Sequence, residues 1–160
     1  MNKAYLLIGS NIGDRKLYLL EAKHFLNAIG HVAKASSIYE TAAWGKTNQA
    51  TFLNQALLLE TVLEATELLN NILGIEEKMG RKRLEQYGSR IIDIDILLFN
   101  DDVINTPTLT VPHPAMINRS FTLIPLAEIA SNIVHPVYNK TIQILLKECT
   151  DMLNVEKFIG

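Results

Sequence analysis

Residues 87–99 read YGSRIIDIDILLF, and this run predicts a β-strand because β-branched and apolar residues fill most of it. Side chains alternate between the two faces of a strand, so Asp93 and Asp95 should point the same way. The opposite face should turn into a core and carries Ile92, Ile94, Ile96 and Leu98. Because isoleucines opposite the acids are not typical of an edge strand, we expect this strand in the middle of its sheet.

The acid pair suggests a metal site. Two neighbouring carboxylates repel each other and are costly to desolvate, so a cation should lie between them. Mg²⁺ accepts one or two carboxylates and completes its coordination with water and phosphate oxygens. The segment just upstream is basic, with Arg81, Lys82, Arg83 and Arg90. Arginine binds phosphate through two parallel hydrogen bonds. Each feature alone could be a solvated surface. Carboxylates that suit a metal ion, next to arginines that suit phosphate, together favour phosphoryl transfer.

Composition limits the other possibilities. At 160 residues the chain should form a single domain over residues 1–160 that buries roughly two thirds of its unfolded surface. A net charge of −2 gives no support for nucleic-acid or membrane binding. The single cysteine, Cys149, allows no disulfide within the chain, which fits a reducing, cytoplasmic setting. The N-terminus reads as neither a signal peptide nor a membrane span. We expect a monomer.

The order of the predicted elements indicates the fold. Strands are expected at 4–8, 32–39, 52–62 and 87–99, and helices at 15–29 and 65–79. This βαββαβ order is typical of an α+β, ferredoxin-like core, an antiparallel sheet with both helices on one face. The last strand then lies beside the first. The remaining residues hold all five prolines and should form an irregular C-terminal extension with short helices at 121–129 and 141–149.

Two further clusters are candidates for chemistry. His113 lies between two prolines, which hold its backbone extended, and with Arg119 nearby it could contact phosphate as a donor or general acid. Asn118 could simply cap a helix. Phe52 and Asn54 share a strand face, and spacing alone favours a core phenylalanine and a satisfied buried amide. The chain has no G-x-x-x-x-G-K-[ST] motif, so it is not a P-loop enzyme.

Several short motifs, in order along the chain, resemble those of the 6-hydroxymethyl-7,8-dihydropterin pyrophosphokinases of folate biosynthesis. The most specific is the G-x-R-x-x-D-x-D pattern that runs from Gly88 to Asp95. The others are Gly9-Ser10-Asn11-Ile12-Gly13, Phe52-Leu53-Asn54, Val111-Pro112-His113 and Asn118-Arg119-Ser120-Phe121. Several motifs in one order are far more specific than any one of them, and together they span nearly the whole chain.

The resemblance implies transfer of the diphosphate of ATP to the hydroxymethyl group of the pterin, with release of AMP and with two Mg²⁺ ions held by Asp93 and Asp95. The residues it implies for catalysis are Asp93, Asp95, Arg81, Arg90, His113 and Arg119. Those implied for nucleotide binding are Arg81, Arg83, Arg90, Ile96, Thr110, His113 and Arg119. Those implied for pterin binding are Thr41, Ala42, Ala43, Phe52, Asn54, Tyr87, Asp93 and Phe121.

Two alternatives stay open on the residues alone. One is a different Mg²⁺-dependent phosphoryl or nucleotidyl transferase on a ferredoxin-like core. The other is a non-catalytic binding domain of that fold, for RNA or for a small effector. An RNA-binding sheet needs exposed aromatic side chains and a basic face, and the net charge and the acid pair weigh against it. An effector-binding domain would leave Asp93 and Asp95 without a role.

Overall fold

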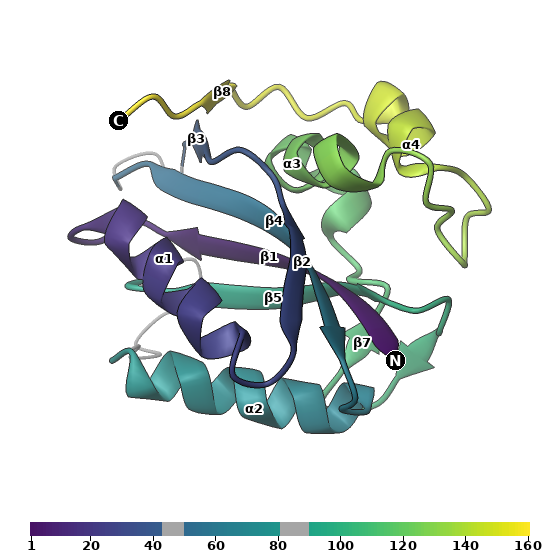
Figure 1. The fold of residues 1–160 in the computed structure, drawn as a ribbon. Helices are drawn as coiled ribbons and strands as arrows, with labels where there is room; N and C mark the ends of the chain where they lie inside the picture. Colours follow the sequence, from purple (N-terminus) through teal and green to yellow (C-terminus); the bar gives the residue numbers. More distant parts are fainter. Residues whose placement is uncertain (43–49, 81–89) are drawn as a thin grey trace.

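The computed structural model describes residues 1–42, 50–80 and 90–160, and Figure 1 shows a twisted antiparallel sheet with helices on both sides. Within these ranges the main sheet has the strand order β5-β1-β4-β3-β8, and β2 also pairs with β4. Its strands are β1 (Asn2–Ser10), β2 (His31–Ala35), β3 (Tyr39–Thr41), β4 (Phe52–Thr61), β5 (Asp93–Phe99) and β8 (Val155–Lys157). Two short strands, β6 (Ile104–Asn105) and β7 (Thr110–Val111), form a separate ribbon.

The predicted α+β, ferredoxin-like core is confirmed. Helices α1 (Arg15–Leu26) and α2 (Ala65–Lys78) lie together on one face of the sheet (Figure 1). The apolar stripe of α1 and the longer one of α2 pack there against inward-facing residues of β1, β4 and β5. This first core contains Leu19, Leu26, Leu68, Ile72, Leu6, Ile8, Leu57 and Ile94.

The acid-bearing strand β5 pairs with β1, as expected, but it lies at the end of the strand order and not in the middle of the sheet. The prediction of a central strand was therefore wrong. Ile94 and Ile96 are buried all the same, because they turn into the first core. The backbone N–H of Ile94 donates to the carboxylate Oε2 of the buried Glu76 of α2, at 2.8 Å. A side chain from α2 thus satisfies a backbone donor on the side of β5 where the described part of the chain places no further strand.

A β-bulge changes the alternation near the end of β5. Leu6 of β1 pairs with Ile96, whereas Tyr5 pairs with Leu98, so Leu97 is the extra residue. Leu98 consequently packs in the core on the opposite face from Ile94 and Ile96, contrary to prediction. Ahead of the bulge the alternation is regular, so the predicted common face of Asp93 and Asp95 is confirmed.

The C-terminal part is more ordered than expected. Helices α3 (Ser120–Ala130) and α4 (Ile142–Glu148) follow a short 3₁₀ turn, η1 (Met116–Asn118), and build a second core on the other face of the sheet. The two short helices were predicted; the strand β8, which pairs with β3, was not. The single strand expected at 32–39 is divided into β2 and β3, and both pair with β4. No helix of the described ranges is long and apolar enough to cross a membrane.

Candidate active site

A cavity of about 620 Å³ opens on the face of the sheet that carries the acid pair. This volume is in the usual range for small-molecule sites. The register of the sheet places its floor: Gly9 of β1 lies between Asp93 of β5 and Asn54 of β4, and Leu7 lies beside Asp95. Helix α3 lines the cavity on this face, and the cavity continues past β5, the last strand in the strand order, to side chains of α2. Residues from elements that are distant in sequence, β3 among them, therefore meet around one space.

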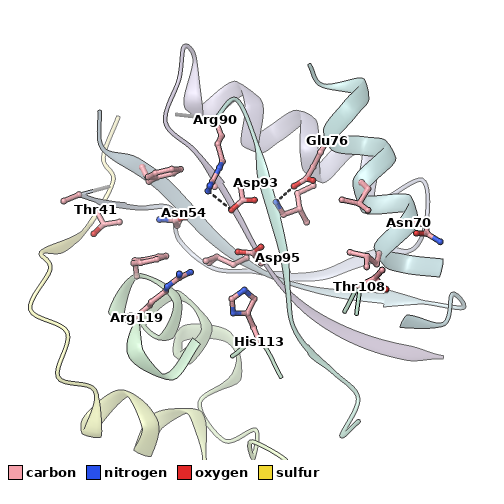
Figure 2. Close-up of a pocket in the computed structure, with 18 residues that line it drawn as sticks. Thr41, Asn54, Asn70, Glu76, Arg90, Asp93, Asp95, Thr108, His113 and Arg119 are labelled. Carbon is pink, nitrogen blue, oxygen red and sulfur yellow. Dashed lines mark hydrogen bonds and ion pairs between the residues drawn. The ribbon is translucent and has the colours of Figure 1, made fainter. Parts of the chain in front are cut away.

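Asp93 and Asp95 lie at the centre of the cavity, with cationic and polar groups around them (Figure 2). The guanidinium Nη1 of Arg90 lies 3.5 Å from Oδ2 of Asp93, and both side chains are largely buried. The cation expected beside the acid pair is thus, in the protein alone, partly supplied by an arginine. Arg90 is held from the other side, because its backbone N–H donates to Oδ1 of Asn11 at 2.7 Å.

His113 faces the same acids from the loop after β7 (Figure 2). Its backbone N–H donates to the carbonyl of Leu97 at 2.9 Å, and its Nδ1 accepts the backbone N–H of Ala115 at 3.2 Å. Burial lowers the pKa of His113, the charge of Arg119 lowers it further, and the charge of Asp93 opposes both. The neutral ring therefore carries its proton on Nε2, which is free of the loop and can donate a hydrogen bond.

Arg119 and Phe121, at the start of α3, form another part of the wall. Both line the cavity, and the guanidinium carbon of Arg119 lies 5.5 Å from the centre of the Phe121 ring. A cation this close to an aromatic face is attracted by the ring. The contact joins a cationic group suited to phosphate with an aromatic surface suited to a flat ring.

The far end of the cavity is lined by Thr41, Ala42, Phe52 and Asn54, of which Asn54 and Thr41 are buried. Arg15 of α1 holds the two chain segments of this end together through hydrogen bonds to residues that do not line the cavity. Its Nη1 donates to Oε2 of Glu40 at 3.0 Å and to Oγ1 of Thr51 at 2.8 Å, the residues next to Thr41 and Phe52. An apolar ring, a buried amide and a hydroxyl thus form a fixed end that can bind a planar heterocycle.

The residues of the remaining wall were not predicted from the sequence. It is formed by Leu69, Asn70, Leu73 and Glu76 of α2, together with Thr108. Leu69, Leu73 and Glu76 recur at helical spacing and so form a second face of α2 beside the core stripe. The one feature of the sequence that could have indicated this wall is the acidic Glu76, which follows the core residue Ile75.

Some residues predicted for the site do not line the cavity. Ile96 is buried in the first core, and Thr110 is exposed on β7. Their assignment to nucleotide binding stays a prediction. Ala43, Arg81, Arg83 and Tyr87 lie outside the described residues. Within the described ranges, no three His, Cys, Asp or Glu side chains are grouped so that they could hold a metal, which leaves the pair Asp93 and Asp95 as the candidate donors.

Comparisons with known proteins agree on one family. A family model described as 7,8-dihydro-6-hydroxymethylpterin-pyrophosphokinase (HPPK) matches residues 5–131. The 2-amino-4-hydroxy-6-hydroxymethyldihydropteridine pyrophosphokinase of Aquifex aeolicus is 46% identical over 143 residues, covering 89% of this chain and 89% of its own. The protein of the same name from Bacillus subtilis is 48% identical over 134 residues, covering 82% and 80%.

Solved structures agree in fold. The wild-type HPPK-DHPS of Plasmodium falciparum, solved with pteroate, has a TM-score of 0.75 and 20% sequence identity. The match covers 92% of this chain but only 42% of that longer chain.

Proposed function

The chain belongs to the 7,8-dihydro-6-hydroxymethylpterin-pyrophosphokinase family, and from this premise we propose which of its residues bind the two substrates. The enzyme transfers the diphosphate of ATP to the hydroxymethyl group of 6-hydroxymethyl-7,8-dihydropterin and releases AMP, a step of folate biosynthesis. The hydroxyl oxygen forms a bond to the β-phosphorus, and the bond from that phosphorus to the α,β-bridging oxygen breaks. In such reactions the protein mainly positions the substrates and stabilises the charge of the transition state.

One observation carries the assignment. The acid pair shares one cavity with the cationic side chains of Arg90 and Arg119, the neutral donor His113 and the aromatic rings of Phe52 and Phe121. A triphosphate and a flat acceptor need these two environments with a reaction centre between them. A non-catalytic effector site would not need Asp93 and Asp95 together on its floor.

We propose that Asp93 and Asp95 hold Mg²⁺, with two ions at full occupancy. Two partly exposed carboxylates on one strand face suit a hard cation that takes one or two carboxylates and fills the rest with water and phosphate oxygens. When bound, the metal neutralises charge on the phosphates and lowers the pKa of a coordinated hydroxyl. Arg90, which lies 3.5 Å from Asp93, is then available to bind phosphate.

The triphosphate is proposed to lie along Arg90, His113 and Arg119. Arginine matches phosphate oxygens with two parallel donors and keeps its charge at any working pH. His113 contributes a neutral donor through Nε2, since Ala115 already occupies its Nδ1. We include Arg81 and Arg83 as further phosphate ligands on the resemblance alone.

The pterin is proposed to lie between Phe52 and Phe121, with Asn54 reading its amide-like edge. Aromatic rings stacked with an offset gain about 0.5–1.5 kcal/mol beyond the area that they bury. Asn54 is 4% exposed, so an analogue without the matching groups would leave a buried amide unsatisfied. Thr41, Ala42, Ala43 and Tyr87 complete the proposed slot.

We further propose that residues 1–160 act as one unit and as a cytoplasmic monomer. The single cysteine, which can form no disulfide within the chain, suits a reducing compartment. Light scattering of the purified protein tests the monomer.

A product assay tests the function. The protein is incubated with ATP, Mg²⁺ and 6-hydroxymethyl-7,8-dihydropterin, and nucleotides are separated by ion-exchange chromatography. We expect AMP only when all three are present, and none when a chelator removes the metal. ADP as the pterin-dependent product would mean ordinary kinase chemistry and would refute diphosphate transfer.

A further inference from the structure

We propose that Asp151, in the C-terminal segment after α4, is a positioning residue that sets Arg119 and Phe121 for the reaction. This inference rests on the proposed function, in which Arg119 binds phosphate and Phe121 stacks on the pterin. Asp151 itself does not line the cavity.

Asp151 acts on the first residue of α3. Its Oδ2 accepts the backbone N–H of Ser120 at 2.9 Å and the Ser120 hydroxyl at 3.1 Å. Its Oδ1 accepts the backbone N–H of Leu153 at 3.0 Å, which fixes the orientation of the carboxylate. The first N–H groups of a helix have no partner within the helix and favour negative charge. Asp151 therefore caps α3 although it is 31 residues away from Ser120 along the chain.

The residue that Asp151 holds lies directly between the two working side chains. Arg119 precedes Ser120 and Phe121 follows it, and the guanidinium carbon of Arg119 lies 5.5 Å from the centre of the Phe121 ring. Burial of Asp151 raises its pKa, but hydrogen bonds from Leu153 and Ser120 and the charge of Arg119 outweigh burial, so its pKa lies below the ordinary value. The carboxylate is thus ionised at neutral pH and interacts with the start of α3 and with Arg119.

The segment that carries Asp151 continues to the other wall of the cavity. Three residues later, the carbonyl of Asn154 accepts the hydroxyl of Thr41 at 3.0 Å. Strand β8 then pairs with β3, with Val155 opposite Thr41. One stretch of chain therefore contacts both the Phe121 wall and the Thr41 wall, and Asp151 is its anchor at α3. These contacts give Asp151 and its neighbours the means to set the distance between the two walls.

Asp151→Asn tests the proposal, because it keeps the size of the side chain but removes its charge. The amide also places an NH2 donor against one of the two backbone N–H groups, of Ser120 or of Leu153, that now donate to the carboxylate. Thr141→Ala is the matched control: the Thr141 hydroxyl accepts the N–H of Ile144 and caps α4 in the same layer, away from the cavity. Loss of a helix cap lowers stability in either case, so both variants should melt at a lower temperature than wild type. KM for each substrate and kcat are measured well below the melting temperature.

We expect Asp151→Asn to raise the KM for the pterin about tenfold and the KM for ATP several-fold, since hydrogen bonds to a charged partner are the stronger ones. Thr141→Ala should lose stability with both KM values within about twofold of wild type. Unchanged KM values in Asp151→Asn, or equal rises in both variants, would overturn the proposal.

A second variant covers the case in which Asp151→Asn does not fold. Ser120→Ala removes only the hydroxyl bond to Asp151 and should raise the pterin KM about two- to threefold. An unchanged pterin KM in Ser120→Ala would then overturn the proposal. Wild-type protein that forms no AMP would overturn the proposed function, and this inference with it. An active wild type with an unaffected Asp151→Asn overturns only the inference.

Discussion

Gly9→Ala should impair pterin binding while leaving ATP binding intact. Gly9 lies in β1 between Asn54 and Asp93, on the face that floors the cavity. A Cβ added there would lie 2.6 Å from Oδ1 of Asn54 and 3.5 Å from the carbonyl oxygen of Leu53. Carbon and oxygen approach comfortably to roughly 3.3 Å, so the Asn54 amide has to move by about 0.7 Å. The backbone contact with Leu53 is already comfortable.

The displacement sets the size of the effect. An amide group moved by about 0.7 Å loses most of the strength of a buried hydrogen bond, and an unsatisfied buried partner costs about 1–3 kcal/mol. That range corresponds to roughly a five- to 150-fold weaker pterin affinity. Stability should change little or rise, because alanine within a strand is favoured over glycine by about 0.5–1 kcal/mol. Binding and stability are thus expected to move in opposite directions.

Steady-state kinetics and pterin titration calorimetry measure the effect. The matched control is Gly74→Ala in α2, where an added Cβ would meet no atom of residues 1–42, 50–80 and 90–160 within 4 Å, apart from the helix's own backbone. This control should stabilise the protein by up to about 1 kcal/mol and leave both KM values unchanged. In an Asn54→Ala background, Gly9→Ala should add no further loss. Wild-type pterin affinity in Gly9→Ala would refute the assignment of Asn54 to the pterin edge.

Three further changes have defined outcomes. Asp95→Ala should abolish turnover with an unchanged circular dichroism spectrum, and activity that survives at saturating Mg²⁺ would contradict the metal assignment. Phe121→Ala should weaken pterin binding about tenfold or more and ATP binding much less, whereas equal losses would make the ring merely a core residue. The His135 Nδ1 accepts the N–H groups of Val137 and Tyr138, and burial lowers the pKa of His135 below 6.5. The unfolded chain then binds the proton more readily, so stability should be complete above about pH 6.5 and fall below it. His135→Asn should flatten the melting-temperature profile between pH 8 and 5, and an unchanged slope would contradict this reading.

Local pattern was sufficient for much of the fold. Period-two alternation placed Asp93 and Asp95 on one face, and helical spacing in 65–79 predicted α2 within a residue or so. Gly74 shows the limit of such reading: a glycine inside a helix is typical of close packing, but no atom of the described residues outside its own helix backbone would lie within 4 Å of a Cβ added there. The bulge at Leu97 could not be predicted, because the register of β5 depends on β1, more than eighty residues earlier in the chain.

In the candidate site, too, some residues could be predicted from local spacing and others could not. The acid pair and Arg90 could be proposed from their spacing, since one strand and its flank carry them. Phe52 and Asn54 looked like core residues on spacing alone, and only the resemblance placed them in a pterin slot. Contacts such as Asp151 with Ser120 join segments that no periodicity links. Such contacts arise where two separate elements pack, and a single sequence carries no local signal for them.

The central claim is that two phosphoryl groups move as one unit, and the fate of the β-phosphate tests it most directly. ATP that carries a radioactive β-phosphate is incubated with the enzyme, Mg²⁺ and the pterin, and the products are separated. We predict that the label leaves the nucleotide completely and appears in the pterin product, with unlabelled AMP formed in equal amount. Label retained in ADP, beside an unlabelled phosphorylated pterin, would contradict the account.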